Sequence, residues 1–321
     1  MRLGIVTDSL SALPFEEMLD VCVELGITDL EFPVGGWSTA PHCDAEALLA
    51  SDAALDGFLR EIDERGLRIS AFNANGNPLH PVTGPADDAV LRRAVELAAR
   101  TGVETVVCMS GLPGGSPQDR TPNWITTSWP PETTRILAYQ WDEVALPYWE
   151  RMAAYGQERG VRFAIEMHGS QLVHSASTLL RLRERIGEQI GANVDPSHPM
   201  WQGADPRAVV AALDGAIHHV HAKDVRMNSR VVDVDGVLDT TPLEKPSQRA
   251  WNFVTLGLGA PGGATFWGQL FSDLRAAGYD GVLSIEHEDV HRDAREALAQ
   301  TVSFLRGVTP DAPASWRPAD I

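Results

Sequence analysis

The stretch GVRFAIEMH, residues 160–168, contains the three signals that decide the fold of this 321-residue chain. A glycine ends a helical pattern, a short apolar run then predicts a buried strand, and a carboxylate and an imidazole follow at the end of that strand. Glycine tolerates the left-handed conformation that ends a helix, so the chain can turn directly into the next strand. The stretch therefore predicts a helix–strand repeat with polar groups at the carboxyl end of its strand.

The same sequence of helix, glycine and strand recurs along the chain, at Gly26, Gly66, Gly102 and Gly278. Such repeats of about 30 residues imply a parallel sheet, and eight of them favour a single (β/α)8 TIM barrel. A doubly wound open sheet is the alternative, but no GxGxxG motif follows the first strand. The expected strands cover residues 3–7, 29–32, 68–72, 105–109, 162–167, 190–194, 217–221 and 281–286, and the clearest helical patterns cover 15–25, 87–100 and 266–277.

The chain length fits one domain, because α/β barrels commonly need about 250 residues. We expect residues 1–308 to form the barrel and residues 309–321, which contain three prolines and no periodic pattern, to form an irregular tail. Two connections are long, at about 111–131 and 227–263. Both follow strand carboxyl ends, so both are expected to overhang the mouth of the barrel, where active sites lie.

The composition excludes several classes of protein. The chain has 26 Lys and Arg against 44 Asp and Glu, a net charge of −18. An acidic protein repels phosphate backbones and anionic lipids, so neither nucleic acid nor a membrane is an expected partner. No apolar run approaches the roughly 20 residues of a membrane helix, and the N-terminus has no signal-peptide pattern. Three widely spaced cysteines, Cys22, Cys43 and Cys108, indicate a reducing compartment and hence the cytoplasm.

Chemistry-bearing residues concentrate at the ends of the last four strands, where Glu166, Asp195, His221 and Glu286 stand. Side chains alternate along a strand, and neighbouring strands of a barrel end at one mouth, so we expect these four to converge. Three carboxylates at close range repel one another unless a cation compensates them. Three oxygen ligands and one imidazole suit Mn²⁺, Mg²⁺, Co²⁺ or Zn²⁺, and the lack of a cysteine ligand argues against a structural zinc. We expect one divalent ion per chain, with Mn²⁺ as the first choice.

With these features the chain resembles, over nearly its whole length, the xylose-isomerase-like barrels, also called the sugar phosphate isomerase/epimerase superfamily. It looks most like a branch whose members handle inositol ketones, ketoses and 3-oxo-glycosides and include the larger subunit of C-glycoside deglycosidases. The local likeness is carried by residues 76–81 (GNPLHP), 193–198 (NVDPSH), 219–224 (HVHAKD) and 281–289 (GVLSIEHED).

The resemblance implies specific roles for residues that match the family's motifs. The metal ligands fall on Glu166, Asp195, His221 and Glu286, and none of these positions is substituted. Contacts to substrate hydroxyls fall near His198. In the resembled epimerases, Glu166 and Glu286 are metal ligands and also the pair that removes and returns the proton.

The expected function is a metal-dependent carbohydrate enzyme that removes a proton next to a carbonyl through a metal-bound enediolate, as a sugar or oxo-sugar isomerase or epimerase does. A third catalytic candidate is His168, because alternation places it on the face of its strand's carboxylate and nearer the mouth. The candidate substrate-binding residues are His80, His198, Lys223 and Arg226.

The main alternative is a lyase that eliminates the substituent of a 3-oxo-glycoside, as the catalytic subunit of a C-glycoside deglycosidase does. A DNA-repair endonuclease on this fold is less favoured because it needs a basic groove, and a non-catalytic sugar-binding subunit is less favoured because the ligand set is complete. The expected partners are a neutral sugar or 3-oxo-glycoside, together with a second copy of the chain or a small second subunit docked on 227–263 or the tail.

Aromatic residues near the expected mouth suggest how such a substrate is held. Aromatic faces stack on sugar rings and on aromatic aglycones, and the tryptophans in question are Trp124, Trp129, Trp201, Trp251 and Trp267. The glycine-rich residues 257–263 lie where barrels often bind phosphate, but they contain no Lys or Arg. We therefore expect a plain loop there and a substrate without phosphate.

Overall fold

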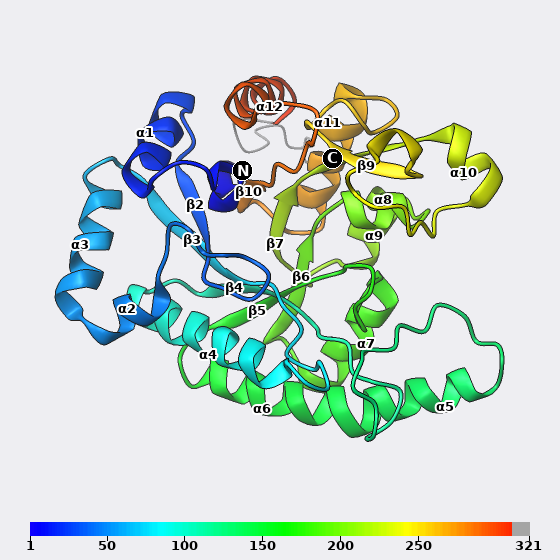
Figure 1. Cartoon of the computed structure of the whole chain (residues 1–321). Coiled ribbons are helices and arrows are strands. Elements are labelled where there is room, and N and C mark those ends of the chain that lie inside the picture. The colour runs from blue at the N-terminus through cyan, green and yellow to red at the C-terminus, as the bar shows by residue number, and fades with distance from the viewer. Residues whose placement is uncertain (310–321) are drawn as a thin grey trace, which may run out of the picture.

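Eight parallel strands close into a barrel in the computed structural model, which describes residues 1–309 (Figure 1). The strand order around the barrel is β1-β10-β7-β6-β5-β4-β3-β2. This confirms the (β/α)8 barrel, and each expected strand lies within two residues of an observed one. The strands are β1 (Arg2–Val6), β2 (Asp29–Pro33), β3 (Arg68–Ala74), β4 (Thr105–Met109), β5 (Arg162–Glu166), β6 (Ile190–Val194), β7 (Ile217–Ala222) and β10 (Val282–Ile285).

Helices surround the barrel, and several end as the glycine pattern predicts. Gly26 follows the first long helix with φ 68°, and Gly102 follows another with φ 71°, so both adopt the left-handed conformation that glycine tolerates. The helices of the outer layer are α1 (Phe15–Leu25), α2 (Ala45–Ala50), α3 (Asp52–Asp63), α4 (Gly84–Thr101), α5 (Glu132–Ala138), α6 (Leu146–Gln157), α7 (Ala176–Ile186), α8 (Ser197–Trp201), α9 (Pro206–Ala212), α11 (Ala264–Ala276) and α12 (Ala294–Val308).

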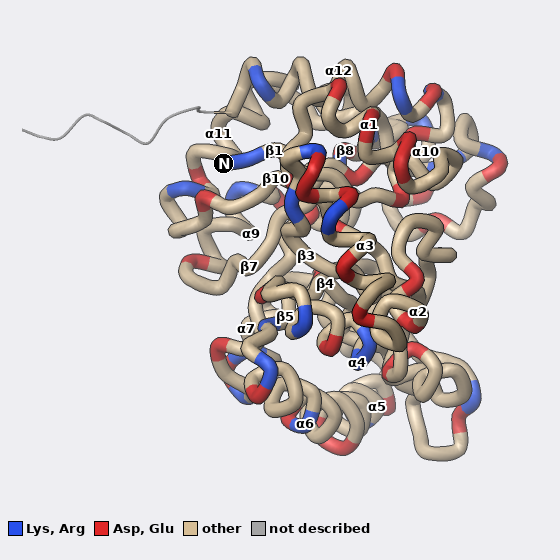
Figure 2. The backbone as a smooth tube through the Cα atoms, turned by 90° about the vertical axis from the view of Figure 1, so that its left-hand side faces the viewer, with Lys and Arg blue, Asp and Glu red and all other residues tan. Residues whose placement is uncertain are grey.

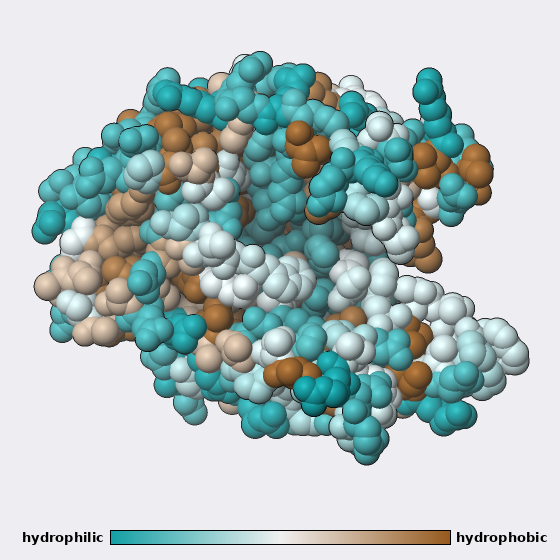
Figure 3. Space-filling model, viewed as in Figure 1, coloured by the Kyte–Doolittle hydropathy of each residue, from teal (hydrophilic) through white to brown (hydrophobic). Residues whose placement is uncertain are grey.

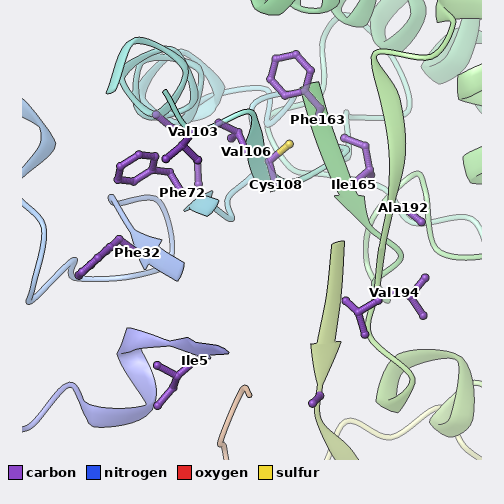
Figure 4. Packing of buried hydrophobic residues seen from close by; sticks show 14 of the residues in the cluster. Ile5, Phe32, Phe72, Val103, Val106, Cys108, Phe163, Ile165, Ala192 and Val194 are labelled. Atoms are coloured by element: carbon purple, nitrogen blue, oxygen red, sulfur yellow. The ribbon is translucent and has the colours of Figure 1, made fainter. Parts of the chain in front are cut away.

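The hydrophobic core lies mainly between the strands and the helices (Figure 4). Phe163 of β5 packs edge-on against Trp149 of α6 at 5.6 Å between ring centroids, and Phe32 of β2 packs against Phe58 of α3 at 5.1 Å. Because side chains alternate along a strand, the neighbours of these residues face the inside of the barrel. A small inner cluster of Ala71, Val107 and Ala164 forms there, and polar residues occupy much of the interior closer to the mouth.

The two long connections differ in structure. Residues 111–131 contain no helix or strand before α5 begins, whereas the 227–263 segment is partly ordered into regular elements. There, α10 (Ser229–Asp235) is followed by β9 (Trp251–Val254), which pairs antiparallel with β8 (Asp224–Met227). The sequence did not predict this hairpin. Both connections lie on the right-hand side of the view in Figure 1.

Charged residues are spread over the outer helices on the face that Figure 2 displays, and they form no continuous basic stripe on that face. Such a distribution offers no track for a phosphate backbone. Within residues 1–309, no helix is long and apolar enough to cross a membrane. The expected irregular tail, apart from Thr309, lies outside the described residues.

Candidate metal centre and active site

The carboxyl ends of β5, β6, β7 and β10 bring together Glu166, Asp195, His221 and Glu286, the four residues expected to hold a metal. One potential ligand atom from each lies within 4.8 Å of every other. His221 Nδ1 is 3.1 Å from Glu286 Oε2 and 3.6 Å from Glu166 Oε2. Neighbouring ligands of an ion with bonds of about 2.1 Å are roughly 3.0–3.5 Å apart, so this spacing suits a small divalent cation.

Two atoms of this cluster test whether a cation fits. Asp195 Oδ2 and His221 Nδ1 are buried and have no hydrogen-bond partner in the protein. Buried polar atoms are almost always paired, because leaving one unpaired costs about 1–3 kcal/mol. A divalent cation among the four residues would satisfy both atoms and compensate the carboxylates. Mn²⁺, Mg²⁺, Co²⁺ and Zn²⁺ all accept this set of oxygen and imidazole donors.

The orientation of His221 is set by Glu31, a residue that the sequence analysis missed. His221 donates from Nε2 to Glu31 Oε1 at 3.0 Å, which leaves Nδ1 facing the other three ligands. Glu31 also accepts hydrogen bonds from His219, Asn73 and Ser284 at 2.7–2.8 Å. Metal-bound histidines usually donate their second ring N–H to such a group. The signal that could have revealed Glu31 was a carboxylate inside the strand DLEFP, flanked on both sides by apolar residues.

Two asparagines, also missed from the sequence, hold the side chain of Glu166. Asn75 and Asn193 donate to Glu166 Oε2 at 3.1 and 3.2 Å. The other oxygen, Oε1, lies 3.0 Å from His198 Nε2. Glu166 is 1% exposed, so these contacts fix its carboxylate at the floor of the barrel mouth.

The charges of the cluster depend strongly on one another. Burial raises the pKa of Asp195 to about 8, and the nearby Glu166 and Glu286 add to this, against Lys223. Burial also acts to raise the pKa of Glu286, but Lys223 and His221 outweigh it and hold that pKa at about 2. The carboxylates thus differ in proton affinity although they share one site. Three carboxyl groups thus share one buried site, and a divalent cation bound there would displace the Asp195 proton and compensate the carboxylates.

His198 and His168 lie side by side at this site. Burial and the neighbouring His168 lower the pKa of His198 to about 3, so its ring is neutral. Trp201 donates from Nε1 to His198 Nδ1 at 3.3 Å, which leaves the His198 proton on Nε2, facing Glu166. The rings of His168 and His198 are 4.2 Å apart between centroids. His198 therefore contacts Glu166 and is fully buried, whereas His168 is only partly buried.

A cavity of about 240 Å³ opens above the cluster. Its walls include the expected residues Glu166, His168, Lys223 and Glu286. Residues that the sequence analysis did not single out also line it: Val6, Asp8, Ser9, Pro33, Trp37, Ser38, Asn73, Asn75, Met109, His287 and Glu288. Figure 3 shows a hollow lined by hydrophilic residues in the middle of the displayed face. The site is therefore open to a polar small molecule.

Lys223 forms ion pairs with two carboxylates of the cavity wall. Its Nζ lies 3.1 Å from Glu286 Oε2 and 3.0 Å from Glu288 Oε2, and it stands 4.2 Å from the ring centre of Phe253. Burial acts to lower the pKa of Lys223, but Glu286 and Glu288 outweigh it and raise that pKa. The ammonium group stays charged and holds Glu286 in place.

Two candidate substrate-binding residues lie elsewhere. His80 Nδ1 accepts the backbone N–H groups of Val82 and Thr83 at 3.1 Å just before α4, and His80 does not line the cavity. Arg226 is exposed on the β8–β9 hairpin and does not line it either. His80 lies among the turns that precede α4 and Arg226 lies within β8, and neither side chain is part of the cavity wall.

The glycine-rich loop 257–263 is occupied by a side chain of the protein itself. The carboxylate of Asp224 accepts backbone N–H groups of Gly257, Gly259 and Ala260 at 2.9–3.0 Å. Backbone N–H groups arranged in this way can hold a phosphate, but here a buried carboxylate already fills that role. This arrangement is consistent with the expectation of a plain loop.

The five tryptophans expected near the mouth fall into three groups: a stacked pair, a core residue, and two residues of the 111–131 connection. Trp201 and Trp251 stack with their ring centroids 4.7 Å apart, next to His198, whereas Trp267 is fully buried in α11. Trp129 is 72% exposed. Trp124 lies in the 111–131 connection, with its ring 5.8 Å from that of His174. Trp267 is therefore a core residue and does not face the site.

Residues 19–308 match the family model of the xylose isomerase-like TIM barrel, and the chain belongs to this family. It is 43% identical over 314 residues to the uncharacterized protein YfiH of Bacillus subtilis (strain 168), an alignment that covers 94% of this chain and all of YfiH. This confirms the family that the sequence resembled, which includes sugar isomerases and epimerases.

Solved structures share the fold at low sequence identity. A D-psicose 3-epimerase in the presence of D-fructose superposes with a TM-score of 0.61 and 13% identity, covering 96% of this chain and 99% of the epimerase. A xylose isomerase-like TIM barrel protein from Mycobacterium smegmatis in complex with magnesium superposes with a TM-score of 0.61 and 15% identity, covering 93% of this chain and 90% of that one. These likenesses concern the fold.

Proposed function

We propose that this protein is a divalent-metal-dependent enzyme that removes and returns a proton next to the carbonyl of a sugar or oxo-sugar without phosphate. One observation carries the proposal: four potential ligands cluster at the mouth, two of them (Asp195 and His221) with an unpartnered buried atom and the other two (Glu166 and Glu286) in the wall of a cavity lined largely by polar residues. A divalent cation at this point supplies a Lewis acid that polarises a carbonyl and offsets the negative charge that develops beside it. Mn²⁺ remains our first choice.

The carboxylates Glu166 and Glu286 are the proposed proton carriers. Both line the cavity, and the Glu286 side chain is 15% exposed, so it can touch a substrate. Its low pKa keeps it ionised and able to accept a proton. A proton taken up there removes its attraction to Lys223, 3.1 Å away, which favours return of the proton to the substrate. His168 lines the same cavity and can exchange a proton with a substrate hydroxyl.

The charge of the cavity supports a neutral substrate. Asp8, Glu166, Glu286 and Glu288 line it, against a single cation, Lys223, that already contacts two of these carboxylates. A phosphate group would bring two more negative charges to this site without a free cation to receive it. A polyhydroxy ketone or an oxo-sugar adds no charge and can form hydrogen bonds with the polar walls.

Deuterium exchange tests the proposal. The protein is stripped of metal, reloaded with Mn²⁺, Mg²⁺, Co²⁺ or Zn²⁺, and followed by NMR in D₂O with a panel of ketoses and 3-oxo-glucosides. We expect metal-dependent deuterium uptake at the carbon next to the carbonyl, and elemental analysis should find about one ion per chain. Absence of exchange and of metal binding for every ion would refute the assignment, and faster turnover of a sugar phosphate would refute the substrate class.

Elimination is the second candidate outcome of the same chemistry. Removing a proton next to a C3 carbonyl can expel the substituent at C1, and a second cavity of about 290 Å³ beside the site gives such a substituent room. In that case we expect a small second subunit as the partner, and a second copy of this chain is the alternative partner. The NMR assay distinguishes the outcomes, because elimination releases the substituent whereas epimerisation keeps it.

We place this reaction in the cytoplasm. Cys22, Cys43 and Cys108 are all buried free thiols, and burial raises the pKa of Cys22 and Cys43 to about 12. Such thiols stay protonated and unreactive, as expected for structural cysteines in a reducing compartment.

A further inference from the structure

A second cavity lies beside the candidate active site, between the connection after β4 and the segment that follows β5. It measures about 290 Å³ and has no assigned role. Its apolar wall is formed by Leu112, Trp124, Leu137, Trp141 and Leu172. Apolar walls with a few polar groups are typical of small-molecule sites, and this volume suits one or two fused rings.

Polar atoms without partners accompany this apolar wall. Gln171 Oε1, Gln140 Oε1 and Trp124 Nε1 are buried, belong to residues that line the cavity, and have no hydrogen-bond partner. The Gln140 amide is fixed, because its Nε2 donates to the carbonyls of Pro113 and Asn123 at 3.1 and 2.6 Å. The terminal amide torsion of a glutamine is broad, so Gln171 can turn its oxygen toward a ligand. A ligand hydroxyl would supply the missing donor.

One side of this cavity carries a positive charge, that of Arg181. The Arg181 guanidinium lies 4.3 Å from the ring centre of Trp141, and both residues line the cavity. Its ion pair with Asp142 is loose, at 3.6 Å, and both partners are about half exposed. Electron-rich aromatic rings are attracted to such a guanidinium and to the edges of tryptophan rings. Together with the Gln171 acceptor, these features select a phenolic ring.

The chain segment around Gly169 separates the two cavities. Gly169 directly follows His168, and a Cβ at Gly169 would lie 2.5 Å from the Trp201 ring and 3.6 Å from the Trp124 ring. The approach of the Trp201 ring to the backbone requires a glycine here, and the Trp124 ring lies at ordinary contact distance. Leu172 N donates to the Gly111 carbonyl at 3.1 Å, which holds the segment against the connection after β4. His168 lines the cavity over the metal site, and Trp124, which lies close to Gly169, lines the second cavity, so the two cavities lie on either side of this segment.

We propose that this second cavity binds a phenolic ring carried as a substituent by the substrate whose sugar part occupies the metal site. The inference rests on the proposed function for the sugar part, but the cavity itself can be tested without turnover. It makes the substrate a glycoside with an aromatic substituent and makes the cavity the element that selects it. The sugar supplies the reacting carbon, and the cavity supplies part of the binding free energy.

The first experiment measures binding of 2-naphthol to the metal-loaded protein by calorimetry. We expect saturable 1:1 binding, weakened about tenfold in Gln171→Leu, which removes the acceptor, and abolished in Thr126→Trp, which fills the cavity from its exposed rim. The control, Gln118→Leu, changes an exposed glutamine of the same connection that does not line the cavity and should bind as the wild type does. Circular dichroism checks that each variant folds.

The second experiment compares methyl and 4-hydroxyphenyl 3-oxo-β-glucosides as substrates. We expect a higher kcat/KM for the phenolic compound, with this preference lost in Gln171→Leu and Thr126→Trp while turnover of the methyl compound persists. Lack of saturable 2-naphthol binding, binding that neither variant alters, or equal kcat/KM for the two glucosides would each overturn the proposal. If neither glucoside exchanges a proton, the proposed function fails, and the calorimetry still decides whether the cavity binds a phenol.

Discussion

The two ends of the barrel each bury a carboxylate, but only the carboxylate at the amino end has hydrogen-bond partners for both of its oxygens. At the amino end, Asp29 is 0% exposed and accepts hydrogen bonds from Arg2 and Arg68, both at 3.1 Å, and from Thr28 at 2.7 Å. At the carboxyl end, Asp195 is 2% exposed, yet its Oδ2 has no hydrogen-bond partner. Burying a charge costs free energy unless partners compensate it. The carboxylate at the first end is fully paired within the protein, whereas the one at the second end keeps an unpaired oxygen in a cluster that could hold a cation.

Glu31 lies between these two ends: it is fully hydrogen-bonded, as Asp29 is, and it contacts the cluster that contains Asp195. It lies on β2 two residues after Asp29 and, like Asp29, it is fully buried and surrounded by donors. Burial acts to raise its pKa, but His221 and His219 outweigh this and keep it well below the usual range. Glu31, whose oxygens are fully hydrogen-bonded, accepts a hydrogen bond from His221 and so orients a potential ligand of the cluster at the carboxyl end. Along β2, therefore, Asp29 forms ion pairs at the amino end of the barrel, and Glu31 supports the cluster at the carboxyl end.

The largest effect is expected at the carboxyl end, for Glu286→Gln. This change removes a ligand charge and a proton carrier together, so deuterium exchange should fall by more than the roughly 10²–10⁴-fold expected for loss of acid–base catalysis alone. Elemental analysis should show reduced metal content, while thermal unfolding should change little because repulsion among the carboxylates is relieved. The control is Glu184→Gln, on the exposed surface of α7. Unchanged exchange in the Glu286 variant would remove this residue from the mechanism.

A smaller effect is expected for His168→Gln. His168 lines the cavity but is not among the four potential ligands, so the variant should keep its metal. We expect kcat to fall by about 10²-fold, the lower range for losing one proton-transfer group. Elemental analysis and steady-state kinetics on the same preparation separate the two roles. Kinetics equal to those of the wild type would reduce His168 to a packing residue, and loss of metal would place it among the ligands.

The strands and the clustering of the four potential ligands could be predicted from the sequence because their signals are local. Glycine marks the entry to five of the eight strands. Glu166 ends β5 and Glu286 directly follows β10, so both stand at the carboxyl ends of their strands. Glu31 could not be assigned in this way, because its contact with His221 spans 190 residues and exists only once the barrel closes. The β8–β9 hairpin escaped prediction for a similar reason, since the β8–β9 partners are separated by α10 and the residues after it.

Short motifs were less informative than strand ends. His80 stands in the GNPLHP stretch that carried part of the family likeness, yet its ring accepts two backbone N–H groups before α4. The sequence cannot distinguish a histidine that caps local backbone from one that faces a substrate, because both follow a strand. The cavity residues Asp8 and Trp37 lie after other strands without any motif. Their placement depends on how the connections fold back over the barrel.

At the amino end, Asp29→Asn should lower stability and spare chemistry. The substitution removes the charge that Arg2 and Arg68 share, but both guanidinium groups are about half exposed and water can solvate them. We therefore expect a loss of about 2 kcal/mol in the free energy of unfolding, below the range for fully buried pairs. Urea denaturation measures this, with deuterium exchange as the parallel readout at the carboxyl end. Lost exchange at unchanged stability would contradict the division between the two ends.

The smallest effect concerns His218, which packs against Gly191 and donates from Nδ1 to the Phe163 carbonyl at 3.0 Å. Burial, with help from Arg162, lowers the pKa of His218 to about 4. Between pH 6.5 and 4 the unfolded chain therefore binds a proton at His218 that the folded chain does not, so acid favours unfolding in this window. From pH 6.5 to 5.5, this residue should cost about 1 kcal/mol of stability. His218→Asn keeps a donor for the Phe163 carbonyl but cannot titrate, so its urea midpoint should fall less than that of the wild type over the same interval. Parallel curves for the two proteins would show that His218 ionises equally in the folded and unfolded states, which would contradict its lowered pKa.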